Sequence, residues 1–260
     1  MNYQTLTLAA EGEITLLTFN RPAKRNALSY QLIGELQAAL QELETGSTRV
    51  LLLTGAGHCF CSGMDLEELK AITGRTAAEN REDSATVARL FRSIYEFPRP
   101  TIAAVNGAAV AGGCGVATLC DFTLASTEAK FGYPEPRIGF LPAIVSSWFV
   151  RQIGEKRARE LLLTGRMISP DEALRLGMIT EIVEPARLLE RARELASQLL
   201  ENSPASLAST KKLLNAYSRR DLEWQLELAV EANSAIRATD DFREGVSAFL
   251  EKRAPRWSRS

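Results

Sequence analysis

Two glycine-containing stretches decide the fold expected for this chain: Phe60-Cys61-Ser62-Gly63-Met64-Asp65-Leu66 and Asn106-Gly107-Ala108-Ala109-Val110-Ala111-Gly112-Gly113-Cys114-Gly115. Glycine lacks a Cβ and tolerates unusual φ/ψ angles, so each turn can bring bare backbone N–H groups close to a ligand atom. Two such groups that converge on one oxygen form an oxyanion hole. The second stretch runs from an apolar strand-like segment (residues 101–105) into a helix-like one (residues 116–119), which adds the positive end of a helix dipole. The pattern predicts a site that stabilises developing negative charge.

Strand-like and helix-like segments alternate around these turns, which favours an α/β fold. Residues 14–19 alternate as a strand does, and residues 50–54 indicate a short buried strand. Between them, residues 29–43 place leucine and isoleucine on one helical face, with Ser29 able to cap the helix. A further helix is expected near residues 87–95, and the pattern is almost wholly helical from residue 185 onward.

The segment at residues 70–84 is polar and charged, and it directly follows the first glycine turn. We expect a mobile surface loop there. Two roles stay open for this loop: a solvated connection without function, or a flap over the bound substrate.

Composition excludes several classes of protein. At 260 residues the chain is long enough to bury a hydrophobic core, and 45% hydrophobic with 24% charged residues is ordinary for a folded soluble protein. The net charge of -1 gives no electrostatic reason to expect nucleic acid or an anionic membrane as a partner. No stretch approaches about 18 uninterrupted apolar residues, so no membrane span is expected. The first residues lack the charged and apolar regions of a secretory signal.

The cysteine and histidine pattern does not predict a metal site. Cys59, Cys61, Cys114 and Cys120 have none of the usual zinc spacings, and His58 is the single histidine. Reduced, partly buried thiols in a cytosolic enzyme are the simplest interpretation. The lone histidine also argues against Ser-His-Asp or Cys-His hydrolysis, unless His58 itself is the base.

Five motifs in order along the chain resemble those of the crotonase family, the enoyl-CoA hydratases and isomerases that act on acyl-CoA thioesters. Besides the two glycine turns, they are Asn20-Arg21-Pro22 with Asn26-Ala27-Leu28, Phe131-Gly132-Tyr133-Pro134-Glu135, and Phe249-Leu250-Glu251-Lys252-Arg253. The resemblance covers nearly the whole chain. It implies a spiral of ββα units at residues 1–195 and a helical C-terminal segment at residues 196–260, which serves oligomerisation and active-site closure. It also implies a trimer or hexamer in the cytoplasm and no cofactor apart from the coenzyme A of the substrate.

The same resemblance implies roles for individual residues. The backbone N–H groups of Met64 and Gly112 would hold the thioester oxygen, and Glu135 would carry the proton. Pro134 and Pro136 restrict the backbone around Glu135, and a carboxylate in a largely apolar pocket is expected to have a raised pKa. Substrate and coenzyme A contacts are implied for Lys24, Arg25, Ala27, Ser62, Asp65, Leu66, Glu67, Gly113, Phe249 and Lys252.

Two departures from the family pattern bear on the reaction. Typical hydratases carry a second glutamate immediately after Gly-Gly-x, where this chain has Gly115. One carboxylate is sufficient to move a proton between carbons, so a Δ3,Δ2-enoyl-CoA isomerase stays open beside a hydratase. Many relatives also read Pro-Gly-x-Gly-Gly after the glutamate loop, where this chain has Pro142-Ala143-Ile144-Val145-Ser146. A non-catalytic acyl-CoA binding or assembly protein is the alternative of a different class.

Overall fold

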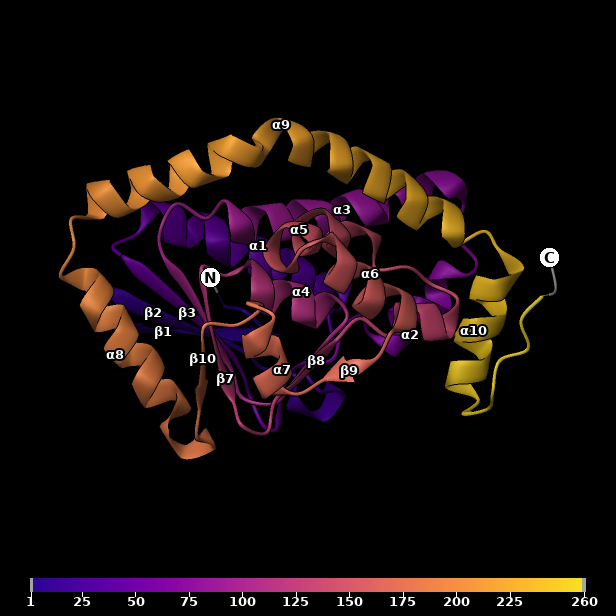
Figure 1. Ribbon diagram of the computed structural model, residues 1–260, viewed down its shortest axis with the longest axis horizontal. Coiled ribbons are helices and arrows are strands. Elements are labelled where there is room, and N and C mark those ends of the chain that lie inside the picture. The colour runs from indigo at the N-terminus through magenta and orange to yellow at the C-terminus, as the bar shows by residue number, and fades with distance from the viewer. Residues whose placement is uncertain (1, 259–260) are drawn as a thin grey trace.

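Two sheets organise residues 2–258, the part of the chain that the computed structural model describes (Figure 1). The six-stranded sheet has the order β1-β2-β3-β5-β7-β10, and the four-stranded sheet has the order β4-β6-β8-β9. The larger sheet comprises β1 (Leu6–Glu11), β2 (Ile14–Phe19), β3 (Val50–Gly55), β5 (Thr101–Val105), β7 (Phe122–Ser126) and β10 (Glu181–Val183). The smaller sheet comprises β4 (Cys59–Cys61), β6 (Ala108–Val110), β8 (Lys130–Gly132) and β9 (Met167–Ile168).

The chain alternates between the two sheets, and this alternation builds the predicted spiral. Strands β3, β5 and β7 lie in the large sheet, and each is followed within a few residues by its neighbour in the small sheet, β4, β6 and β8. Pairing is parallel from β2 through β10, whereas β1 with β2 and β8 with β9 are antiparallel. Every residue of β3 and β5 is buried, as expected for parallel strands that are covered on both faces.

Helices cover both faces of the large sheet. The helices of residues 2–258 are α1 (Tyr30–Thr45), α2 (Leu66–Ile72), α3 (Ala77–Tyr95), α4 (Gly112–Leu119), α5 (Ala143–Ile153), α6 (Glu155–Thr164), α7 (Pro170–Arg175), α8 (Leu188–Leu200), α9 (Pro204–Ile236) and α10 (Asp240–Leu250). Short 3₁₀ turns occupy Pro22–Lys24, Glu135–Ile138 and Pro185–Arg187.

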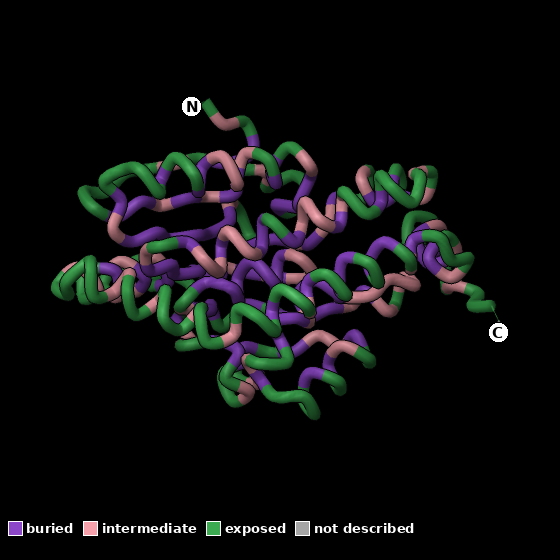
Figure 2. Tube along the Cα trace, turned by 90° about the horizontal axis from the view of Figure 1, so that it is seen from above, coloured by how far each residue is buried: buried purple, intermediate pink, exposed green. Residues whose placement is uncertain are grey.

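The main hydrophobic core lies on one face of the sheet, where side chains such as Leu17, Leu51 and Leu53 pack against α1, α3, α4 and α5. On the other face, Val50, Leu52 and Ile102 pack against α8. The long helix α9 arches over α3 and α5, and α10 lies beyond its C-terminal end (Figure 1). Exposed residues gather on the outer sides of the helices, and buried ones fill the strands beneath them (Figure 2).

Most predicted elements are confirmed, including the Ser29 side chain that accepts a hydrogen bond from the Leu32 N–H at the start of α1. The loop predicted at residues 70–84 is wrong. Helix α2 continues to Ile72, and α3 begins at Ala77 with a capping box between Thr76 and Glu79. The polar character of this segment therefore comes from a solvated helical face and its cap. The predicted division after residue 195 falls inside α8, which packs on the sheet.

No helix within residues 2–258 is long and apolar enough to cross a membrane.

Candidate active site

The two glycine turns meet directly in space. Gly63 has φ +87°, and a Cβ built on it would lie 2.9 Å from the Ala111 Cβ and 3.7 Å from the Gly112 nitrogen. Ala111 itself has φ 51° and ψ −125°, a conformation that is rare for a residue with a side chain. Because ψ of Ala111 sets the direction of the next peptide N–H, this strained residue fixes where the Gly112 N–H points.

Both proposed oxyanion donors are free of other hydrogen bonds. Leu28 forms a parallel bridge with Met64. The Leu28 N–H donates to the Gly63 carbonyl, and the Asp65 N–H donates to the Leu28 carbonyl. Gly112 is the first residue of α4, where N–H groups have no partner inside the helix. Across residues 2–258, neither the Met64 N–H nor the Gly112 N–H has an acceptor. Two residues with unpaired N–H groups, Met64 and Gly112, therefore line one cavity.

Glu135 begins the 3₁₀ turn that follows β8, and its backbone is held by Pro134 and by the Phe140 N–H, which donates to the Glu135 carbonyl at 3.0 Å. The residue is only 9% exposed, and its Oε2 has no hydrogen-bond partner within the described residues. Burial raises the pKa of Glu135 to about 8. A carboxyl group of this kind holds a proton at neutral pH and can release it close to physiological conditions.

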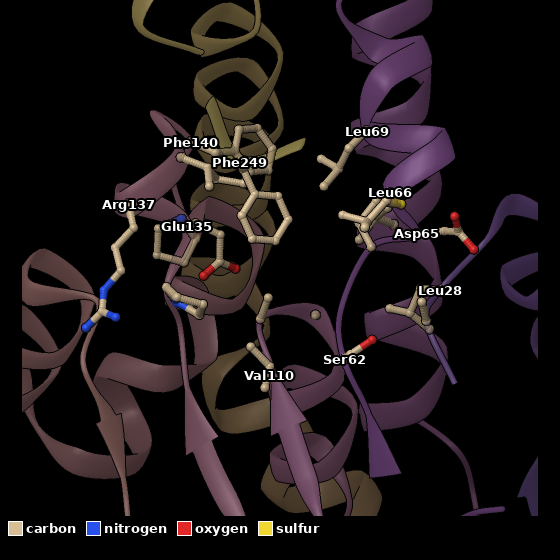
Figure 3. A pocket seen from close by; sticks show the side chains of 18 of the residues that line it. Leu28, Ser62, Asp65, Leu66, Leu69, Val110, Glu135, Arg137, Phe140 and Phe249 are labelled. Atoms are coloured by element: carbon tan, nitrogen blue, oxygen red, sulfur yellow. The ribbon is translucent and has the colours of Figure 1, made fainter. Parts of the chain in front are cut away.

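These groups line one cavity of about 890 Å³. Figure 3 shows the Glu135 carboxyl group facing the Ser62 to Leu66 side across the cavity, while the Arg137 side chain points away from it. Of the residues predicted for the site, the following line the cavity: Lys24, Arg25, Ala27, Ser62, Met64, Asp65, Leu66, Glu67, Gly112, Glu135 and Phe249.

Two predicted contact residues do not line this cavity. Gly113 is buried, and a Cβ there would clash with the Cys61 carbonyl, so its glycine serves the close packing of α4 on β4. Lys252 is exposed after the end of α10, whereas Arg253 and Pro255 reach the cavity wall. Lys24 does line the cavity, but in this structure it forms an exposed ion pair with Glu67 at 2.8 Å.

The first turn is held by residues whose roles were not predicted. Arg21 Nη2 donates to Asp65 Oδ2 at 2.8 Å, and Arg21 Nη1 donates to the Ala27 carbonyl. Asn26 is fully buried at φ 54°, accepts from the Arg21 N–H, and donates to the Ala56 and Cys59 carbonyls. The available signal was the pair of motifs around Asn20 and Asn26, which marked the family but suggested no contacts.

The position of the missing second carboxylate is filled by apolar atoms. A Cβ at Gly115 would lie 2.6 Å from Val145 Cγ1 and 3.1 Å from the ring of Phe91. Both Val145 and Phe91 line the cavity. Glu135 is therefore flanked on this side by hydrocarbon, not by a partner acid.

Thiol, histidine and metal chemistry have no support in the geometry. Burial raises the pKa of Cys61, Cys114 and Cys120 to about 12, so these thiols stay protonated at neutral pH. His58 is exposed and lies outside the lining of the cavity, which argues against it as a catalytic base. Among residues 2–258, no cluster of three or more His, Cys, Asp or Glu side chains is placed to hold a metal ion.

The known proteins that resemble this chain in sequence and in structure carry related names. The sequence profile of the family described as "Enoyl-CoA hydratase/isomerase" matches residues 9–260. A Thermus thermophilus protein provisionally named an enoyl-CoA hydratase is 44% identical, over 95% of this chain and 98% of its own. The short-chain-enoyl-CoA hydratase of Clostridium acetobutylicum is 34% identical, over 97% of each chain. The crystal structure of an enoyl-CoA hydratase/isomerase from Xanthobacter autotrophicus Py2 superimposes with a TM-score of 0.89 at 28% identity, covering 96% of this chain and 97% of that one.

Proposed function

This chain belongs to the enoyl-CoA hydratase/isomerase family, and we propose that it uses Glu135 as the single acid–base group on an enoyl-CoA thioester. The observation that carries this proposal is the buried Glu135 carboxyl group, with Oε2 unpartnered among the described residues, in the same cavity as the Met64 and Gly112 N–H groups. A group that only stabilised the fold would be expected to satisfy its buried oxygen with a hydrogen bond.

In the proposed mechanism, the thioester oxygen accepts hydrogen bonds from the Met64 and Gly112 N–H groups. These donors stabilise the negative charge of the enolate, which forms when water adds to the β-carbon or when the α-carbon loses a proton. For hydration, the Glu135 carboxylate takes a proton from water as the water oxygen adds to the β-carbon. The resulting carboxylic acid then delivers that proton to the α-carbon, so one group completes the addition of one water molecule.

Hydration is supported by the names of the relatives, several of which are enoyl-CoA hydratases. A second candidate is Δ3,Δ2-isomerisation, in which Glu135 removes an α-proton and returns it to the γ-carbon. The packing of Val145 and Phe91 against Gly115 favours this second reaction, because it leaves no carboxylate there to position water.

The coenzyme A part is proposed to lie along Lys24, Arg25, Ser62 and residues 65–67, which line the cavity. Since both reactions move only protons or water, they need no cofactor beyond the substrate thioester. We also propose a trimer or hexamer, because α9 exposes large apolar side chains: Leu213, Leu214, Tyr217, Trp224 and Leu228. The four unpaired cysteines fit a reducing compartment such as the cytoplasm.

The test is mass-resolved turnover of trans-2-enoyl-CoA and of 3-enoyl-CoA by the wild-type protein and by Glu135→Gln. Gain of one water on the first substrate establishes hydration, and an unchanged mass with new conjugation on the second establishes isomerisation. The variant is expected to lose about 10²–10⁴ in rate. Glu128→Gln is the matched control, because Glu128 is exposed and does not line the cavity. Tight acyl-CoA binding without turnover of either substrate would indicate the non-catalytic binder instead.

A further inference from the structure

The α9 side of the cavity carries two buried polar side chains that the proposed reaction does not use. Asn233 and Arg237 lie one turn apart on the last part of α9 and its C-terminal cap, and both line the cavity. Asn233 is 6% exposed, and the Arg237 side chain is 2% exposed. Burying an amide and a guanidinium group beside an acyl pocket is costly unless their hydrogen-bonding groups are used.

The orientation of the Asn233 amide is fixed by its neighbours. Its Oδ1 accepts from Arg237 Nη2 at 2.9 Å and lies 2.8 Å from the Ser84 hydroxyl group. Because a guanidinium group can only donate, the oxygen must face Arg237, and the amide nitrogen points the other way. Within the described part of the chain, Asn233 Nδ2 has no acceptor. Asn233, a residue only 6% exposed in the cavity wall, therefore keeps an unused donor.

Arg237 shares its hydrogen-bond acceptors with other donors. Arg237 Nη1 lies 3.3 Å from both Asn80 Oδ1 and Asp83 Oδ2, and the same Asp83 oxygen is shared with Arg75. Tyr30 also donates to this oxygen at 2.6 Å. One carboxylate thus serves two guanidinium groups, and Arg237 Nε has no partner within residues 2–258. Arg237 is therefore only partly paired at the cavity wall.

This wall belongs to the same cavity as Glu135 and adjoins Phe140. The Arg237 guanidinium carbon is 5.7 Å from the centroid of the Phe140 ring, and the Phe140 N–H donates to the Glu135 carbonyl. Asn233, Arg237 and Glu135 therefore line one continuous cavity, which an acyl chain bound at Glu135 would share.

We propose that Asn233 and Arg237 form a subsite for a carboxylate at the far end of the acyl group. The inference rests on the proposed function, since it takes the cavity as the acyl-CoA site and adds the class of acyl group. Asn233 Nδ2 supplies a hydrogen bond to the carboxylate, and Arg237 supplies the compensating charge.

The test measures binding of saturated analogues, so that it does not depend on turnover. Calorimetric dissociation constants are compared for the six-carbon acyl-CoA that ends in a carboxylate and for hexanoyl-CoA. The wild-type protein is expected to prefer the acid-ended analogue. Asn233→Asp keeps the acceptor oxygen for Arg237 and Ser84 but removes the donor and adds a negative charge, and Arg237→Gln removes the cation. Each should lower the preference by about 10- to 100-fold, the range for a hydrogen bond to a charged group.

Arg81→Gln is the matched control, because Arg81 pairs with Glu231 of α9 at the surface and does not line the cavity. It should leave the preference as in wild type, and thermal unfolding confirms that each variant is folded. The proposed subsite would be wrong if the wild-type protein, Asn233→Asp and Arg237→Gln all showed the same preference for the acid-ended analogue over hexanoyl-CoA. Failure of the proposed function has a different signature: no turnover of either enoyl-CoA isomer, whatever the binding preference.

Discussion

Val145 occupies the space that a side chain at Gly115 would need. A Cβ at position 115 would lie 2.6 Å from Val145 Cγ1, closer than real Cβ contacts come. The family pattern that the motifs resemble has a glutamate where this chain has Gly115 and a glycine where it has Val145. The two departures from the family pattern are therefore in contact in this chain, where a small residue on α4 leaves room for a larger one on α5.

We expect Gly115→Glu to be tolerated only when Val145 is reduced. The single variant overpacks the contact and should lose about 1–3 kcal/mol of unfolding free energy. Val145→Ala removes Cγ1 and keeps a helix-forming residue, so the double variant should recover part of that loss. Chemical denaturation of wild type, both single variants and the double variant measures the coupling. Additive losses in the double variant would show that the two residues do not share this space.

The pH dependence of the reaction should follow Glu135. Hydration and isomerisation both begin with Glu135 taking a proton, so the carboxylate is the active form. Because burial raises the pKa of Glu135 to about 8, most molecules are protonated at pH 6. We expect kcat/KM to rise about tenfold per pH unit below that pKa and to level off above it. Steady-state rates between pH 5.5 and 9.5 test this. A profile that is flat through pH 6–8 would mean that Glu135 is already ionised in the free enzyme.

The sequence predicted the parts of the site that depend on local chain geometry. Strands β3 and β5 are largely apolar, and the glycine-containing stretches that follow them can be recognised in the sequence. Helix α3 was predicted to begin about ten residues too late, because a solvated helical face is as polar as a loop and its Thr76–Glu79 cap was not recognised. Asn233 and Arg237 were missed for another reason. They reach the cavity only because α9 folds back over α3, and no spacing within the sequence encodes that contact.

Gly63→Ala tests whether Gly63 holds the two oxyanion donors in place, apart from the stability cost of its backbone strain. Gly63 has φ +87°, and a methyl group there would push on Ala111 at 2.9 Å and on the Val110 carbonyl at 3.1 Å. We expect a loss of about 10²–10³ in kcat as the Met64 and Gly112 donors move apart, beyond the stability cost of the φ angle. Gly12→Ala is the control, since Gly12 has φ +65° and nothing within 4 Å of the added Cβ. It should cost about 1–2 kcal/mol of stability and leave kcat as in wild type. Equal kcat values in Gly63→Ala and Gly12→Ala would show that Gly63 is not needed to hold the two N–H donors in place.

Asp65→Asn should weaken the turn that presents the Met64 N–H. Burial raises the pKa of Asp65, but the Arg21 side chain, the Glu67 N–H and the Lys24 charge together outweigh it, and the net pKa is lowered. The ionised pair therefore stabilises the fold at neutral pH, and this contribution is lost as the pH falls through the acidic range. Asp65 is 3% exposed, so the isosteric amide should cost roughly 1–3 kcal/mol.

The kinetic readout distinguishes positioning from stability alone. If Arg21 and Asp65 hold Met64 in place, Asp65→Asn should lower kcat about tenfold at a temperature where the variant is fully folded, because small misplacements of an aligned donor are costly. Glu67→Gln is the matched comparison for stability, since the Lys24–Glu67 pair is exposed and should contribute less than about 1 kcal/mol. A variant that loses stability but keeps kcat would show that the Arg21–Asp65 pair supports the fold and not the alignment of the donor.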